Sequence, residues 1–369
     1  MRIHIFVGTG GVGKTSVTAA SALSAALQGE RALVLTIDPA RRLRTALGLD
    51  AINDASSADA ARLQQQVSLD SISSGGTRGE LHAVMLDVAS SLNRAVRLHA
   101  SPKQAEEILA HPIYQVLLRS LAGMQELMAV ERLDQAIAEG FESVYVDTAP
   151  SRHALEFVDK PEFFAQLVSF PIVRLVGKTY RWWEKSGIGR FSRGTFELYT
   201  RVEDMLGSHL TRQVLDFFSI FRGIAEGYAH RARHTAELLR DPAITSFTVV
   251  TNPLKAVRDA DFFLKELERR RFHVSSLVMN RVWPRLENMS RINDSLTTAT
   301  AAGMDDATRE ALRGTIAWYD AVSRSHQTVW NHVHSSYSQR IPHLVQVPEL
   351  PEDIAGLPAL QHIAQHMKA

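Results

Sequence analysis

The chain has 369 residues, of which 45% are hydrophobic, enough for a sizeable core in one large or two ordinary domains. Its 41 basic and 40 acidic residues nearly cancel, so no overall charge argues for nucleic acid or an anionic membrane as a partner. The absence of cysteine excludes disulfides, thiolate metal sites and cysteine nucleophiles. The sequence starts on a predicted core strand and holds no bilayer-length apolar run, so we expect a soluble, cytoplasmic protein.

The first motif along the chain is the loop GTGGVGKTS, which matches G-x-x-x-x-G-K-[ST] without a mismatch. It follows an apolar run at residues 3–7, typical of a buried parallel strand, and precedes a predicted helix at residues 16–28. Glycines let such a loop curl around a phosphate, and the N–H groups of a helix N-terminus donate to it. The sequence therefore predicts a nucleotide site formed by Gly8, Thr9, Gly10, Gly11, Val12, Gly13, Lys14, Thr15 and Ser16.

Two residues of this loop have individual predicted roles. Lys14 should reach the β- and γ-phosphates, and the Thr15 hydroxyl should ligate Mg²⁺. We therefore count Lys14 among the catalytic residues and Thr15 among the metal ligands.

Further apolar runs, separated by helical stretches, predict an α/β fold with a doubly wound, mainly parallel sheet. These predicted strands are Arg31–Asp38, Phe141–Asp147, Ser246–Thr251, His273–Asn280 and His343–Pro348. Two stretches read as helical, residues 81–139, with breaks near Pro102 and Pro112, and residues 161–239. We expect one P-loop domain over residues 1–369, with an inserted helical subdomain.

Two aspartates stand at the ends of predicted strands. Asp147 ends the run VYVD and could hold Mg²⁺ through water, because ligands in such sheets lie at the carboxyl ends of strands. Asp38 ends VLTID and could orient the attacking water beside the metal. Either aspartate could instead cap the helix that follows it. Beside a phosphate loop, the functional role is favoured.

Five motifs follow one another along nearly the whole chain: GTGGVGKTS, TIDPARRLRTALGL, DTAPSRHALEFVD, VMNRVWP and VPELPEDIAGL. In this order they resemble the anion-transporting ATPases, the family of the arsenite-pump ATPase and of the guided-entry ATPase for tail-anchored membrane proteins. The resemblance implies an ATP-hydrolysing homodimer that opens and closes, with ATP and Mg²⁺ as cofactors. It matches Asp38 to the water-activating and metal-site aspartate of switch I and Asp147 to that of switch II. It also matches Asn280 to the adenine-reading asparagine, with Pro348 and Leu350 flanking the base.

The loop departs from the family pattern at Thr9, where relatives usually carry a lysine that crosses the dimer interface. A short neutral hydroxyl cannot make that contact, so activation by a lysine of the second subunit is in question. Arg41, Arg42 and Arg152 are the candidates for the missing cation, since a fixed guanidinium stabilises phosphoryl charge well. They could instead be surface residues or pair with nearby carboxylates. We assign catalytic roles to Arg41 and Arg152.

The resemblance also bears on partners. The family's thiolate arsenite site and its zinc-binding C-x-x-C motif both need cysteine, so the sequence argues against arsenite transport. Residues 161–239 lie where guided-entry relatives insert a client-binding subdomain, which suggests a protein client with a hydrophobic helix. Large apolar side chains there could line a groove or pack a core of their own: Trp182, Trp183, Phe191, Phe196, Met205, Phe217 and Phe221.

Two other classes of function remain open. One is a nucleotide-dependent scaffold or positioning protein with slow or no turnover, which Thr9 favours. The other is a small-molecule P-loop kinase, against which the motifs DTAP and VPELPEDI argue.

Overall fold

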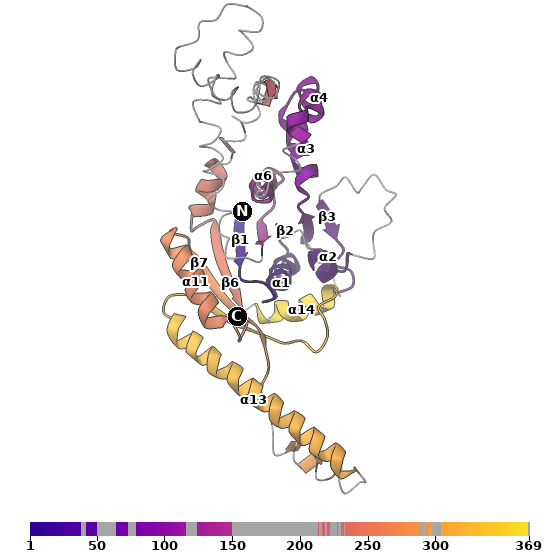
Figure 1. Cartoon of the computed structure of the whole chain (residues 1–369), viewed down its shortest axis with the longest axis vertical. Helices are drawn as coiled ribbons and strands as arrows, with labels where there is room; N and C mark the ends of the chain where they lie inside the picture. Colours follow the sequence, from indigo (N-terminus) through magenta and orange to yellow (C-terminus); the bar gives the residue numbers. More distant parts are fainter. Residues whose placement is uncertain are drawn as a thin grey trace, which may run out of the picture.

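The computed structural model of the chain describes residues 1–37, 42–49, 64–72, 79–115, 124–149, 233–287 and 304–367, with short groups inside 213–231 and 291–298 (Figure 1). Among these residues, none of the helices has both the length and the apolar composition needed to cross a membrane.

In the described part of the chain, eight strands form one sheet in the order β3-β4-β2-β5-β1-β6-β7-β8. All neighbouring strands run parallel except β3, which is antiparallel to β4 at the edge. The predicted α/β class and mainly parallel sheet are therefore confirmed. The strands are β1 (Arg2–Val7), β2 (Arg31–Thr36), β3 (Gln64–Val67), β4 (Glu80–Met85), β5 (Ser143–Asp147), β6 (Thr245–Thr251), β7 (Val274–Val282) and β8 (His343–Pro348).

Helices cover both faces of the sheet (Figure 1). One face packs against α1 (Lys14–Leu27), α2 (Arg42–Leu47) and α14 (Leu357–His366). The small side chains of α1 let that helix lie against both the sheet and α14, and eleven of its fourteen residues are buried. The opposite face packs against α3 (Val88–His99), α6 (Met124–Ala138), α11 (Ala256–Arg269) and the C-terminal end of the long helix α13 (Asp306–Tyr337). A core on each face is what a doubly wound sheet requires.

One part of the predicted helical stretch 81–139 is wrong, because its first residues form strand β4 between β2 and β3. The run ELHAVM is too short for periodicity to separate strand from helix, and pairing with two neighbouring strands decides its conformation. The predicted break near Pro102 is confirmed, since α4 (Pro102–Ala110) begins there with Ser101 and Gln104 forming a capping box. The break near Pro112 is also confirmed, because α4 ends just before His111.

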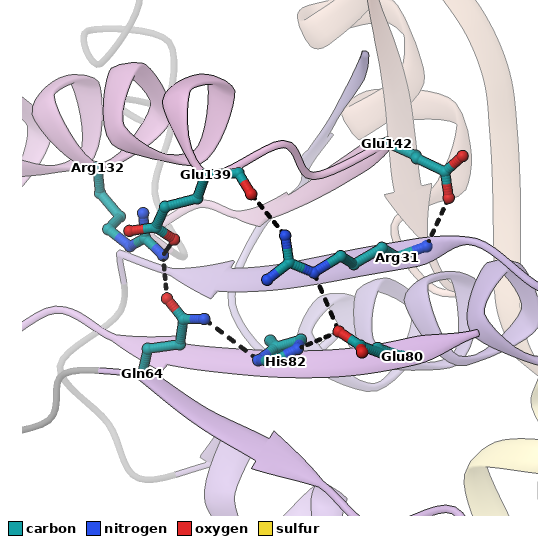
Figure 2. A network of polar contacts seen from close by, with 7 residues as sticks. All are labelled: Arg31, Gln64, Glu80, His82, Arg132, Glu139 and Glu142. Carbon is teal, nitrogen blue, oxygen red and sulfur yellow. Dashed lines mark hydrogen bonds and ion pairs between the residues drawn. The ribbon is translucent and has the colours of Figure 1, made fainter. Parts of the chain in front are cut away.

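A polar network fixes the edge strand β3 to the rest of the sheet (Figure 2). The Gln64 amide donates to His82 Nδ1 at 3.2 Å, and His82 Nε2 lies 3.0 Å from the Glu80 carboxylate. Arg132 of α6 bonds to the Gln64 side-chain oxygen, and Arg31 Nε donates to Glu80 at 3.0 Å. Arg31 and Glu80 begin β2 and β4, so their part of the network lies at the amino ends of the parallel strands, opposite the carboxyl ends of β1 and β5.

The aromatic stretch proposed for client binding lies mostly outside the described residues, including Trp182, Trp183, Phe191, Phe196 and Met205. Phe217 is described and is 1% exposed. It stacks on Phe221 with ring centroids 5.2 Å apart and lies against Tyr114. Phe217 therefore belongs to the protein's own core rather than to a groove.

Candidate functional site

The loop between β1 and α1 has the tight curvature that its glycines predict. Gly13 has φ 81° and precedes Lys14, the first residue of α1. A Cβ at Gly13 would lie 2.1 Å from the side-chain nitrogen of Asn280, and one at Gly8 would lie 2.3 Å from the Val250 carbonyl oxygen. The left-handed conformation and these close approaches explain why glycine is needed at both ends of the loop.

Asp147 at the end of β5 is the central polar group of the site. Its carboxylate, fully buried, accepts hydrogen bonds from Lys14 Nζ at 3.1 Å, the Thr15 hydroxyl at 2.8 Å and the Thr36 hydroxyl at 3.1 Å. Thr36 ends β2 and lies beside Asp147 in the parallel pairing, so strand register fixes their approach. The structure thus brings together three of the predicted site residues, Lys14, Thr15 and Asp147.

These oxygens suit Mg²⁺, a hard cation that prefers carboxylate and hydroxyl ligands and keeps part of its water shell. The Thr15 hydroxyl and the Asp147 carboxylate supply such donors side by side. In the described residues, no group of three or more His, Cys, Asp or Glu side chains could hold a metal by itself. In nucleotide enzymes, phosphates usually complete the coordination of Mg²⁺.

A cavity of about 920 Å³ opens in front of this cluster. Six loop residues line it, including Lys14 and Thr15, and Arg42 at the start of α2 lines it as well. The remaining loop residues among them are Thr9, Gly11, Gly13 and Ser16. The cavity is large enough for a nucleotide and lies at the carboxyl ends of the parallel strands.

The far wall of the cavity comes from the ends of β7 and β8. Asn280 lines the cavity, is 2% exposed, and its side-chain nitrogen donates to the Val12 carbonyl at 2.9 Å. Pro348 and Leu350, the residues predicted to flank the base, also line the cavity. Asn280 therefore connects the predicted base-binding wall to the phosphate loop.

Three predicted catalytic residues, Asp38, Arg41 and Arg152, lie outside the described residues. Their assignments stay predictions. Strand β2 ends at Thr36, two residues before Asp38, and the Ile37 N–H donates to the Asp147 carbonyl at 2.9 Å. The chain leading to Asp38 is thus attached to the end of β5.

Sequence reasoning missed three residues that contact the site. Thr36 could have been found, because a hydroxyl near the end of a strand beside Asp147 is visible in the motif LTID. Asp259 and Lys255 could not have been found from spacing. Asp259 accepts from the Thr9 hydroxyl at 2.5 Å, and Lys255 Nζ donates to the Gly10 carbonyl at 2.7 Å, across about 250 residues of sequence.

Residues 1–298 match the family model described as Anion-transporting ATPase. The chain belongs to this family. It is 24% identical to the putative arsenical pump-driving ATPase 1 of Aquifex aeolicus over 99% of this chain and 78% of that protein. It is 22% identical to the ATPase ASNA1 homolog of Babesia bovis over 88% of this chain and 76% of that protein.

A third relative matches more narrowly. The putative arsenical pump-driving ATPase of Chlorobaculum tepidum is 30% identical over 44% of this chain and 36% of its own length. The chain thus spans little more than a third of that relative's length. Membership of a family of P-loop ATPases agrees with the loop, the sheet and the cavity described above.

Proposed function

We propose that this chain binds Mg²⁺-ATP in the 920 Å³ cavity and hydrolyses it to ADP and phosphate. The observation that carries the proposal is the convergence of Lys14, Thr15 and Thr36 on the buried Asp147 carboxylate behind the cavity. Lysine, hydroxyl and carboxylate are the groups that P-loop enzymes use to hold phosphates and Mg²⁺. The cytoplasm, which supplies ATP, is the compartment that we propose.

Each group has a distinct role in the proposed reaction. Lys14 would meet the negative charge of the β- and γ-phosphates, and Thr15 would ligate Mg²⁺, with Asp147 holding both side chains in place. Mg²⁺, when bound, would neutralise phosphate charge. Asp38 would orient the attacking water, and Arg41 and Arg152 remain the proposed cations. Arg42 lines the cavity and joins this group.

We further propose that the chain works as a homodimer that changes shape with its nucleotide and handles a protein client. The support is the resemblance of its five motifs to those of the guided-entry ATPases, together with its alignment to the ATPase ASNA1 homolog over 88% of the chain. Residues 161–239 are the proposed client-binding part. The lack of cysteine argues against a thiolate arsenite site.

A second candidate function is a nucleotide-dependent scaffold with slow turnover. The observation that favours it is Thr9, whose hydroxyl is bound to Asp259 of its own chain at 2.5 Å and is not a cation. Such a protein would bind Mg²⁺-ATP as tightly as the enzyme, and only the rate of phosphate release distinguishes the two functions.

Two variants test the proposal in order. Lys14→Ala should abolish tight Mg²⁺-ATP binding measured by calorimetry, because it removes the main cation of the phosphate site. An unchanged dissociation constant would reject the nucleotide site. Asp38→Asn should bind ATP within a few-fold of wild type and turn over on the order of a hundred times more slowly. If wild type itself shows no turnover, the scaffold function is favoured.

A further inference from the structure

Helix α11 reaches the phosphate loop through the residue just before its start. Lys255 is the N-cap residue of α11, and its half-buried side chain ends at the loop. Lys255 Nζ donates to the Gly10 carbonyl oxygen at 2.7 Å. A hydrogen bond from an ammonium group is shorter and stronger than one between neutral groups, and this one joins residues that are 245 positions apart.

One turn further along α11, a second side chain contacts the same loop. Asp259 is 1% exposed and accepts a hydrogen bond from the Thr9 hydroxyl at 2.5 Å. Residues four apart lie on the same face of a helix, so Lys255 and Asp259 present a cation and an anion to adjacent loop residues. The first half of the loop is therefore held at two points by one helix of the same chain.

The contact with Gly10 changes the charge distribution of the loop backbone. The Lys255 ammonium beside the Gly10 carbonyl oxygen polarises the whole peptide group, including the N–H of Gly11 at its other end. Gly11 lines the cavity in which we propose that the phosphates bind. A more strongly polarised N–H is a better donor to a phosphate oxygen. Lys255 can thus favour phosphate binding without touching the phosphate.

We propose that Lys255 is a positioning residue for the nucleotide phosphates and places a positive charge from its own chain beside the Gly10 carbonyl. This positive charge lies next to Thr9, which carries no charge of its own. This inference rests on the proposed function, since it concerns how tightly the same site binds phosphate. It makes the charge of that segment a property of one subunit and not of a dimer.

The test measures affinities for Mg²⁺-ATP and, by competition, for adenosine, which has no phosphate. Lys255→Met should weaken ATP binding on the order of tenfold, as expected for the loss of a charged hydrogen bond, and leave adenosine binding unchanged. Lys255→Arg, which keeps the charge, should stay within about threefold of wild type. The matched control is Lys265→Met, which removes the same charge from an exposed position of the same helix.

The outcomes separate the possibilities. If Lys255→Met and Lys265→Met bind ATP equally well, the role of Lys255 is rejected while the nucleotide site stands. An equal loss of ATP and adenosine affinity would mean that Lys255 only supports the fold, which also overturns the proposal. Lys255→Gln retains a donor without charge, so full ATP affinity in this variant would contradict the role of charge. If wild type binds no ATP, the proposed function itself fails.

The effect of Lys255→Met should also be the same at every protein concentration, because the contact lies within one chain. A loss of affinity that appears only at concentrations where subunits associate would assign the cation to a second subunit and overturn the proposal.

Discussion

Lys14 and Asp147 form an ion pair of 3.1 Å in which the side chains are 4% and 0% exposed. A buried ion pair is expensive to break by removing one partner, since the other charge then lies unpaired in a medium that solvates it poorly. The Thr15 and Thr36 hydroxyls also bond to Asp147, so this carboxylate joins the start of α1 and the end of β2 to the end of β5. The fold and the proposed nucleotide site therefore share one residue.

Asp147→Asn should lower the free energy of unfolding by about 3–5 kcal/mol, because Lys14 loses its charged partner. It should also remove most of the increase in ATP affinity that Mg²⁺ gives the wild type. Chemical unfolding and calorimetry with and without Mg²⁺ measure both effects. Asp259→Asn is the control, a buried aspartate on α11 at the other side of the loop, and should retain the Mg²⁺ effect. If Mg²⁺ increases ATP affinity equally in wild type and Asp147→Asn, the proposed role of Asp147 in holding the metal is contradicted.

Thr9→Lys tests whether the loop can recover a trans-acting lysine. The new ammonium would meet the buried Asp259 carboxylate, which now accepts from the Thr9 hydroxyl at 2.5 Å. We expect the lysine to pair with Asp259 in its own chain, so steady-state ATP turnover should stay level or fall at all protein concentrations. A turnover that rises with protein concentration in Thr9→Lys would show that the lysine acts across a dimer and would refute this expectation.

Gly13→Ala should abolish ATP binding and destabilise the fold. The new methyl group would lie 2.1 Å from the Asn280 side chain in a left-handed conformation with φ 81°. Gly29→Ala is a matched control, because Gly29 has φ 101° but open space around it. It should cost about 1–2 kcal/mol of stability and leave ATP affinity intact. Similar ATP affinities for the two variants would mean that Asn280 and the loop do not depend on each other.

His4 should make stability depend on pH. Burial, and to a smaller degree Arg2, lower its pKa from 6.5 to about 4. The unfolded chain binds a proton at His4 more readily than the folded chain does. The contribution of neutral His4 to the free energy of unfolding is therefore complete above pH 6.5 and is lost as the pH falls toward 4. The loss between pH 7.5 and 4.5 should be about 2.5 kcal/mol. In His4→Phe, which keeps a ring beside Tyr145, denaturant unfolding should show a correspondingly smaller loss. An identical pH dependence in both proteins would rule out His4 as the source.

Much of the molecule could be predicted from residues that are near one another in the sequence. The loop from Gly8 to Ser16 specifies its own conformation, because glycine spacing and the helix that follows act over a few residues. The strands β1, β5, β6 and β8 were predicted to within a few residues of their bounds, since each is an apolar run long enough to be buried in a parallel sheet. Family membership follows from the same local motifs.

Strand order and side-chain partners depended on the tertiary structure. The run ELHAVM became β4 because β2 and β3 lie on either side of it, and no local pattern contains that information. Lys255 and Asp259 reach Gly10 and Thr9 only because β6, which pairs with β1, carries the start of α11 to the loop. A hydrogen bond across some 250 residues is fixed by which strands are neighbours. The sequence alone thus predicted which residues form the phosphate loop, and the packing of α11 decided which charged side chains contact that loop.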